Sequence, residues 1–280
     1  MKKMMWNGIA AAVLCLAAGT MACGKAGTAG NTGAAGNQLV MAAAWKQTAA
    51  EYRALYYQAF NVARLHLDNA LAARTAGDKP LAVITDVDDT VLNAADYWAR
   101  LIAAGMDFFD DAVWDSWVAE NRFAATPGAL EFCSYAKDRD VEVFYVTNRD
   151  QGEDTYALAE ANLTSLGFPF VDEAHLFVQR ESSNKEERQQ KIARTHNVVL
   201  MLGDNLNDFR RKYYVKDVDE RLSLMEEDRE LYGMRYIVLP NPTDGHWIRA
   251  IFGDSEPPAT PENRAVFREA AAISRWKRAP

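Results

Sequence analysis

The sequence predicts an α/β fold with a parallel sheet covered by helices on both faces. Strands buried in such a sheet are short, continuous apolar runs, and four are present, at residues 81–85, 141–146, 198–202 and 236–239. Stretches with helical periodicity lie between them, as at 154–166 and 185–195,. Strands that alternate with helices pair in parallel. Ligands bind beyond the carboxyl ends of such strands, so the residues directly after each run are the most informative.

The first 22 residues have the pattern of a secretory signal. A short positive start is followed by an apolar run at 9–18 and then by small residues,. The run is too short to cross a bilayer as a permanent helix. Cys23 follows the small Ala22 and resembles the lipid-modified cysteine of bacterial lipoproteins, although Thr20 stands where leucine is usual. We expect a signal at 1–22 and a lipid on Cys23, with a plain signal cleaved near Ala22 as the alternative.

The segment at 23–37 predicts a flexible tether between a lipid anchor and a folded domain. It consists largely of glycine, alanine and polar residues, which bury too little apolar surface to offset the entropy of ordering,. The remaining residues, 38–280, suit one large domain. Gly24, not aspartate, follows the cysteine, and by analogy with bacterial lipoproteins this favours the outer membrane.

An amphipathic helix is expected before the first strand. Apolar residues recur at steps of three or four from Trp45 to Leu71, and residues 77–80 (GDKP) end the pattern,. The sequence therefore predicts an N-terminal helical extension to the sheet.

Charge and cysteine content argue against a nucleic-acid partner and an intrachain disulfide. The formal net charge of the chain is −8, which offers no electrostatic footprint for a nucleic-acid polymer. Cys15 leaves with the signal and Cys23 carries the lipid, so Cys133 stands alone in an apolar stretch typical of a core,. The expected partners are small molecules and, at the anchor, a membrane. The sequence leaves open whether the protein forms a homodimer.

Two aspartates directly follow the first apolar run. Asp86 and Asp88 are two residues apart, so on an extended strand end both side chains point the same way,. Close carboxylates raise each other's proton affinity unless a cation lies between them. A divalent metal would resolve this repulsion and leave one carboxylate as nucleophile and the other as proton donor. For this motif alone, an acidic turn that caps a helix is the alternative.

Further polar groups follow the later runs. Thr147 follows the second run and offers a hydroxyl suited to a phosphoryl oxygen,. Lys185 comes after a short strand expected near 175–178 and supplies a mobile positive charge for the same group,. Asp204 and Asp208 follow the third run and add a second pair of carboxylates at the same edge of the sheet.

Together these motifs resemble the haloacid-dehalogenase (HAD) superfamily of phosphohydrolases and, within it, the class C or four-aspartate acid phosphatases. The sequences that carry the resemblance are DVDDT at 86–90, FYVTNRD at 144–150, GDNLNDF at 203–209 and LPNP at 239–242. The resemblance covers nearly all of the chain after the signal. It implies a Rossmann-like parallel sheet with a small helical cap inserted after the first strand, at about 94–130, beside the N-terminal helix.

The resemblance also implies roles for individual residues. Asp86 would attack phosphorus and form an aspartyl-phosphate, and Asp88 would protonate the leaving oxygen and then deprotonate water. Thr147 and Lys185 would hold the phosphoryl oxygens. Asp208 would orient Lys185 or a metal-bound water.

Magnesium is the cofactor that the resemblance implies. Asp86, the backbone carbonyl of Asp88 and Asp204 would bind Mg²⁺, with waters and a phosphate oxygen completing six ligands. The implied activity is hydrolysis of phosphomonoesters, with an optimum on the acid side of neutral. Two alternatives stay open: a phosphotransferase on the same fold, and a surface lipoprotein that binds a ligand without catalysis.

Aromatic residues of the segment at 94–130 are candidates for a substrate pocket. In the family, aromatic residues of the cap stack on a nucleoside or a similar ring, and Trp114 is at the position most like them; a place in the core of the cap is the alternative. The family commonly has an aromatic residue before the glycine of its late motif, where this chain has Asp244, and His246 or Trp247 would have to replace it. We expect aromatic phosphomonoesters, nucleoside monophosphates included, with a weakened preference for nucleotides.

Overall fold

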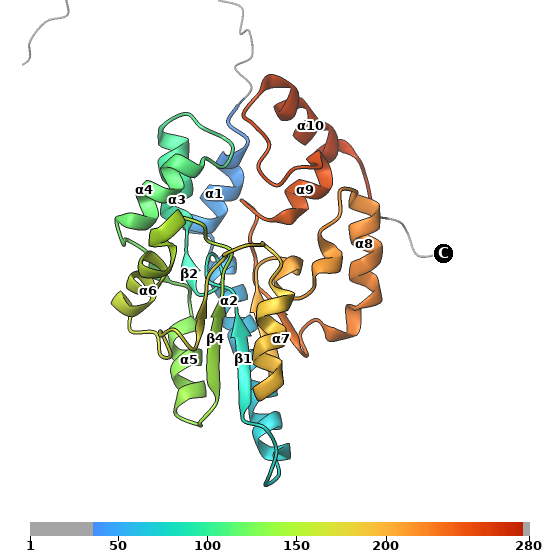
Figure 1. Cartoon of the computed structure of the whole chain (residues 1–280). Helices are drawn as coiled ribbons and strands as arrows, with labels where there is room; N and C mark the ends of the chain where they lie inside the picture. Colours follow the sequence, from blue (N-terminus) through green and yellow to red (C-terminus); the bar gives the residue numbers. More distant parts are fainter. Residues whose placement is uncertain (1–35, 277–280) are drawn as a thin grey trace, which may run out of the picture. The chain divides into compact units, whose positions relative to one another are not determined.

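The computed structural model describes residues 36–276 and has an α/β fold (Figure 1). Its five-stranded sheet has the order β5-β4-β1-β6-β7, and all neighbouring strands are parallel. The strands are β1 (Leu81–Thr85), β4 (Glu142–Val146), β5 (Leu176–Phe177), β6 (Asn197–Gly203) and β7 (Tyr236–Val238). The apolar runs of the sequence are thus confirmed as strands, and so is the short strand expected near 175–178.

Helices cover both faces of the sheet. The side chains of β1 alternate between two cores, with Val83 in the larger and Ile84 in the smaller one, as expected for a strand buried on both faces. Cys133 is free and lies buried in the larger core, as the sequence predicts. The helices over the sheet are α2 (Ala50–Ala73), α5 (Ala129–Lys137), α6 (Thr155–Ser165) and α7 (Glu186–Thr195).

The N-terminal extension consists of two helices, so the single helix expected from Trp45 onward is wrong. α1 (Leu39–Thr48) and α2 are separated at Ala49, whose ψ of 124° is extended. The hydroxyl of Thr48 donates to the carbonyl oxygen of Ala44 at 2.7 Å, and such bonds bend helices. The alanine-rich junction contains no glycine or proline, so periodicity alone could not locate the break.

A small subdomain lies between β1 and β4 in the sequence. It contains α3 (Ala95–Ala103), α4 (Asp111–Ala119) and an antiparallel ribbon of β2 (Leu92–Asn93) and β3 (Ala124–Ala125). Figure 1 shows α3 and α4 beside α1, away from the amino ends of the strands. Aromatic rings pack against one another inside it: Tyr97, Trp98, Phe109, Trp114, Trp117 and Phe123.

Three further helices follow β6, one before β7 and two after it. These are α8 (Val218–Glu227), α9 (His246–Phe252) and α10 (Pro261–Ala272), and α9 packs against both of the others (Figure 1). Short 3₁₀ turns occupy Gly152–Asp154, Leu206–Asp208, Arg211–Tyr213 and Arg229–Leu231.

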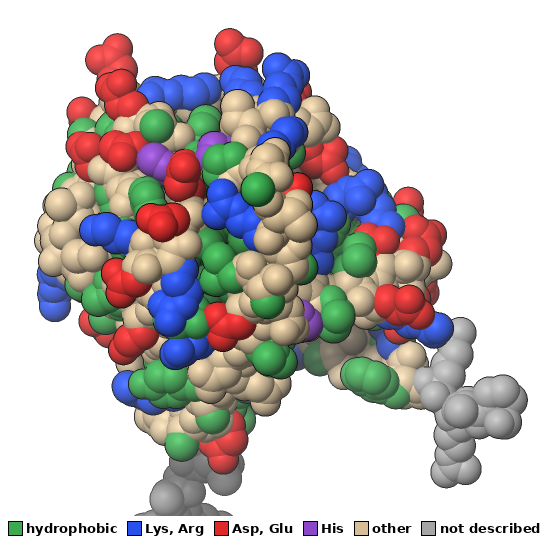
Figure 2. All heavy atoms as spheres, turned by 90° about the horizontal axis from the view of Figure 1, so that it is seen from below, with side chains coloured by type: hydrophobic (Ala, Val, Ile, Leu, Met, Phe, Trp, Pro, Cys, Tyr) green, Lys and Arg blue, Asp and Glu red, His purple; other side chains and the backbone are tan. Residues whose placement is uncertain are grey.

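The expected signal at 1–22 and nearly all of the tether at 23–37 lie outside the described residues. At the end of the tether, the side-chain amide of Asn37 donates to the carbonyl oxygen of Met106 at 2.7 Å. No helix among residues 36–276 is long and apolar enough to cross a membrane. The face in Figure 2 mixes acidic, basic and apolar side chains.

Candidate active site

Residues predicted to act together meet at the carboxyl ends of the three central strands. Asp86 follows β1 directly, and its backbone N–H donates to the carbonyl oxygen of Leu202 on β6 at 2.9 Å. Thr147 follows β4, and Asp204 follows β6. Because β4, β1 and β6 are adjacent and parallel, residues far apart in the sequence converge at one edge of the sheet,.

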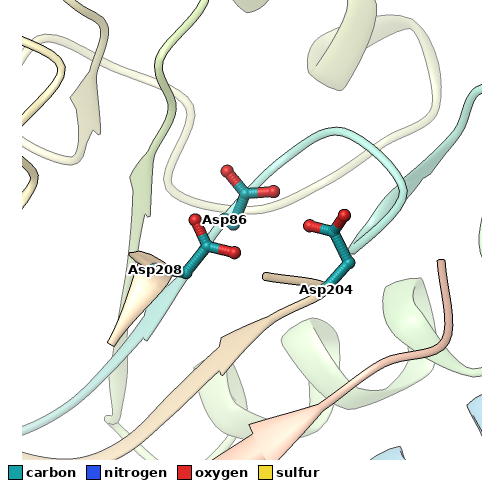
Figure 3. Close-up of side chains that lie close together, drawn as sticks. All are labelled: Asp86, Asp204 and Asp208. Atoms are coloured by element: carbon teal, nitrogen blue, oxygen red, sulfur yellow. The ribbon is translucent and has the colours of Figure 1, made fainter. Parts of the chain in front are cut away.

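Three carboxylates form a cluster that can hold a metal ion (Figure 3). Asp86, Asp204 and Asp208 each offer an oxygen within 4.8 Å of the others. Burial raises the pKa of Asp204 well above its usual range, and the charges of Asp208 and Asp86 raise it further. Among the described residues, the hydrogen bonds to its carboxylate come from neutral donors, the Thr90 hydroxyl at 3.3 Å and the Asn241 amide at 2.7 Å. Carboxylate oxygens are ligands that Mg²⁺ prefers, so the residues fit the expected ion.

Lys185 bridges two carboxylates of the cluster. It immediately precedes α7, and its buried ammonium group contacts Oδ1 of Asp86 and lies 2.7 Å from Oδ1 of Asp208. Burial lowers the pKa of Lys185, but the two carboxylates raise it to about 12, so the group stays charged. Asp208 therefore holds a positive charge beside Asp86.

Gly203 allows Asp208 to come close to the end of β6. A Cβ atom at position 203 would lie 2.5 Å from Cβ and Oδ2 of Asp208, which is a clash. Oδ2 of Asp208 also accepts the backbone N–H of Asn205 at 2.9 Å. The glycine of the GDNLND segment thus serves close packing of the turn that carries two of the clustered carboxylates.

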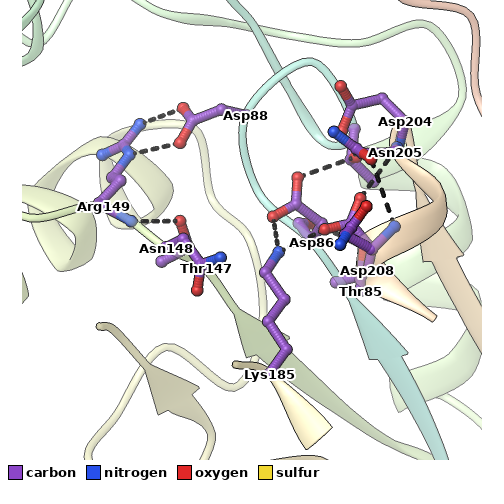
Figure 4. A network of polar contacts seen from close by, with 12 residues as sticks. Thr85, Asp86, Asp88, Thr147, Asn148, Arg149, Lys185, Asp204, Asn205 and Asp208 are labelled. Atoms are coloured by element: carbon purple, nitrogen blue, oxygen red, sulfur yellow. Dashed lines mark hydrogen bonds and ion pairs between the residues drawn. The ribbon is translucent and has the colours of Figure 1, made fainter. Parts of the chain in front are cut away.

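Asp88 points away from the cluster toward an arginine (Figure 4). Arg149 donates from Nε to Oδ2 of Asp88 at 2.8 Å and from a terminal nitrogen to Oδ1 at 2.7 Å. A further bond from Arg149 to Oδ1 of Asn162, at 2.7 Å, fixes the guanidinium group. Burial raises the pKa of Asp88, the ion pair with Arg149 lowers it, and Asp86 raises it, with a net increase. The arrangement holds a proton-accepting group beside Asp86.

Thr147 lies buried at the end of β4, with its backbone and side chain both fixed. Its hydroxyl oxygen accepts the backbone N–H of Arg149 at 3.2 Å, and its carbonyl oxygen accepts from Arg188 at 2.6 Å. Thr147 and Lys185 line the same cavity as Asp86, so a group bound there meets a hydroxyl and an ammonium.

A buried ion pair ties α1 to the loop after β1. The ammonium of Lys46 lies 2.7 Å from Oδ2 of Asp89, and the exposed fractions of the two side chains are 0% and 5%. Asp89 has φ of 53°, in the left-handed region,. Lys46 also lies within 3.4 Å of Oδ1 of Asn241, whose amide reaches Asp204. Removing one partner of a buried ion pair typically costs about 3–5 kcal/mol. Lys46 therefore restrains the loop after β1, and it contacts the loop after β7, from which Asn241 reaches Asp204.

A cavity of about 180 Å³ opens beside the cluster. Trp98, Phe109, Trp114 and Asp244 line it, together with Asp86, Asp88 and Lys185. Trp114 and Asp244, which the sequence analysis named as candidates for the substrate pocket, thus both line this cavity. His246 and Trp247 are not among its lining residues; His246 contacts Asn205 at 3.0 Å, and the Trp247 ring donates to the carbonyl oxygen of Asp244 at 2.8 Å. Neither ring replaces the missing aromatic partner.

Several residues of the site were not singled out from the sequence. Arg149 stands two residues after the predicted phosphate-binding threonine, so its position near a strand end was a usable signal. Asn241 lies in the LPNP motif, which carried the resemblance without suggesting a contact. For Lys46 no local signal exists, because it belongs to an ordinary helical pattern and reaches Asp89 only through the packing of α1 against the cap.

Comparison with known proteins agrees with this geometry. Residues 8–247 match the profile of a family described as the HAD superfamily, subfamily IIIB (acid phosphatase). Two solved structures of the class C acid phosphatase from Bacillus anthracis, one of them with tungstate bound, are similar to this chain with a TM-score of 0.78 and 30% sequence identity. Each match covers 86% of this chain and 98% of the Bacillus protein.

The fold and the site define a phosphomonoesterase of the haloacid-dehalogenase type. Within that class, the chain belongs to subfamily IIIB, the acid phosphatases, and its fold is that of the class C enzymes. The fold class and the family expected from the sequence are therefore confirmed.

Proposed function

We propose that the chain is a magnesium-dependent acid phosphatase in which Asp86 is the covalent nucleophile. One observation carries the proposal: Asp86 stands at the end of the central strand, in contact with Lys185 and in one cluster with Asp204 and Asp208. A carboxylate held there by a fixed positive charge is placed to attack a phosphoryl group whose oxygens the same charge attracts.

The reaction that we propose has two steps. An oxygen of Asp86 bonds to phosphorus while the ester P–O bond breaks, and Asp88 gives its proton to the leaving alcohol oxygen. Asp88 then takes a proton from water, the water oxygen bonds to phosphorus, and the bond to Asp86 breaks to release phosphate. Thr147 and Lys185 hold phosphoryl oxygens in both steps, and Asp208 keeps Lys185 in position.

The carboxylate cluster supports a role for a divalent cation. Asp86, Asp204 and the backbone carbonyl of Asp88 would hold Mg²⁺, with Asp208 close by. When bound, the ion offsets negative charge on the carboxylates and on the phosphoryl group. All of these ligands are oxygens, so Mn²⁺ or Co²⁺ are the expected substitutes.

The expected substrates are phosphomonoesters with aromatic leaving groups, nucleoside monophosphates included. The support is that three aromatic side chains line the cavity together with Asp86 and Lys185: Trp98, Phe109 and Trp114. A base stacked on one aromatic side chain gains about 1–3 kcal/mol.

A panel of phosphomonoesters tests the function and the role of Asp88 together. The wild-type enzyme should hydrolyse both activated aryl esters and alkyl esters. Asp88→Asn should lose about 10²–10⁴-fold in turnover of alkyl esters and much less with an activated aryl ester, because a good leaving group departs without a proton. The matched control is Asp115→Asn, which changes an exposed aspartate outside the cavity. Equal losses on both kinds of ester would show that Asp88 is not the acid.

We further propose that a lipid on Cys23 anchors the enzyme in the bacterial cell envelope, on the outer membrane. The support is the signal pattern at 1–22 and the tether composition at 23–37. Cys23→Ser should move the protein from the membrane fraction to the soluble fraction, as seen by fractionation of expressing cells. Mass spectrometry of the mature protein that finds an unmodified amino terminus at another residue would contradict the proposal.

A further inference from the structure

The cavity beside Asp86 combines aromatic side chains with a carboxylate, Asp244, that the proposed mechanism does not use. Lys185 and Thr147, which are proposed to hold the phosphoryl group, line this cavity. Asp244, between β7 and α9, lines the same cavity with aromatic rings of the cap, Trp98, Phe109 and Trp114. The leaving group of a bound phosphomonoester therefore faces rings and a carboxylate.

Asp244 has no ion-pair partner among the residues that the structure describes. Its carboxylate accepts the backbone N–H of Gly245 at 2.7 Å. Lys46 is the cation that acts on it, but Lys46 is itself paired with Asp89 at 2.7 Å. Burial raises the pKa of Asp244 to about 6, and the charges of Asp89 and Asp88 add to the increase. Asp244 is partly buried. A carboxylate that is withdrawn from water without a cation beside it is unfavourable, so a ligand that supplies the cation would be stabilised there.

Other acidic groups lie close enough to Asp244 to act on it and on one another. Burial raises the pKa of Glu256 to about 7, and the charges of Asp111 and Asp244 add to this. Carboxylates from the cap, the β7–α9 loop and the segment after α9 therefore act on one another. Six aspartates line the cavity against two cations, Arg149 and Lys185, and such an excess of negative charge concentrates ligands that carry positive charge.

We propose that Asp244 is a specificity-determining residue that favours phosphomonoesters whose leaving alcohol carries a positive charge, such as an amino or quaternary ammonium group. This inference rests on the proposed phosphatase function of the same site. Aromatic faces attract cations through their π electrons, and the carboxylate adds direct charge attraction. The cavity of about 180 Å³ suits a compact alkylammonium group. Where an aromatic residue at position 244 would stack on a ring of the substrate, the carboxylate of Asp244 thus recognises a positive charge instead.

The test compares two esters that differ only in charge. Choline phosphate and 3,3-dimethylbutyl phosphate have nearly the same shape, with a cationic nitrogen in the first and a neutral carbon in the second. The ratio of their kcat/KM values is measured near neutral pH, where a carboxyl with a pKa of about 6 is largely ionised. The wild-type enzyme should prefer choline phosphate by about tenfold or more. Asp244→Asn should lower that ratio by about tenfold, and Asp115→Asn should leave it unchanged.

A wild-type ratio near one would overturn the inference, whether or not the Asp244 variant folds. A ratio that survives Asp244→Asn in a folded protein would also overturn it. Hydrolysis of p-nitrophenyl phosphate by the same preparations separates this failure from failure of the proposed function. If the wild-type enzyme cleaves p-nitrophenyl phosphate but shows no preference for charge, only the role of Asp244 is wrong; if it cleaves none of the three esters, the proposed function itself is wrong.

Discussion

Asp86→Asn should reduce turnover by about 10⁴-fold or more, the loss typical of removing a covalent nucleophile. Asparagine keeps the size of the side chain and most of its hydrogen bonding but lacks the charge needed to attack phosphorus. The fold should survive, because the change removes one of three clustered carboxylates and leaves Lys185 paired with Asp208 at 2.7 Å. Burial raises the pKa of Asp86, which means that the folded state disfavours the charge of this carboxylate. Replacing Asp86 with a neutral side chain should therefore not lower thermal stability. Steady-state kinetics and a melting curve measure both effects.

The matched control for this variant is Asp138→Asn, which changes an exposed aspartate at the end of α5. Its kinetics and its melting temperature should equal those of the wild-type enzyme. If Asp86→Asn folds and still retains about a tenth of the wild-type rate, Asp86 is not the nucleophile, because a covalent mechanism cannot lose its attacking group at so small a cost.

Removal of divalent cations should abolish activity, and Mg²⁺ should restore it. The oxygens of Asp86, Asp204 and Asp208 lie within 4.8 Å of one another, and burial, together with the charges of Asp208 and Asp86, raises the pKa of Asp204. A bound cation relieves the repulsion between these carboxylates, so it should also raise the melting temperature. A ligand at a hundred times its dissociation constant stabilises the folded state by about 2.7 kcal/mol. Activity and melting are followed with EDTA and then with added Mg²⁺.

Asp204→Asn is the variant that separates cation binding from other effects of chelation. It removes a ligand charge while its neighbours Thr90 and Asn241 remain. We expect a folded protein that Mg²⁺ no longer stabilises. Full activity after exhaustive chelation, or an unchanged effect of Mg²⁺ on the melting of Asp204→Asn, would contradict the metal site.

The central strands could be predicted from the sequence because they are continuous apolar runs that the helices on both faces of the sheet bury. The run at 81–85 matches β1 (Leu81–Thr85), and the run at 198–202 lies within β6 (Asn197–Gly203). The break between α1 and α2 could not be predicted, because helical periodicity continues through Ala49 and a side-chain bond of Thr48 helps to bend the chain there. The periodicity of apolar residues locates helices and strands, whereas a bend inside a helical pattern depends on individual side-chain contacts that periodicity does not show.

The candidate site divides in the same way. Asp86, Thr147 and Asp204 follow strands that are adjacent and parallel, so the topology alone brings them together. The ion pairs of Lys46 with Asp89 and of Arg149 with Asp88 join residues from separate elements, and each depends on a side-chain direction that spacing does not encode. The sequence drew attention to Asp244 because the family commonly has an aromatic residue at that position. Only the structure shows that its carboxylate lines a cavity together with the rings of Trp98, Phe109 and Trp114.

The most direct test of the central claim is to trap the covalent intermediate on Asp86. The enzyme is mixed with excess p-nitrophenyl phosphate, quenched in acid within one turnover, digested and examined by peptide mass spectrometry. The mechanism predicts one phosphoryl group on the peptide that contains Asp86. Hydroxylamine should remove this group, as it does from acyl phosphates, and the group should be missing from Asp86→Asn. A phosphoryl group on a histidine or any other residue, with Asp86 unmodified, would contradict the account.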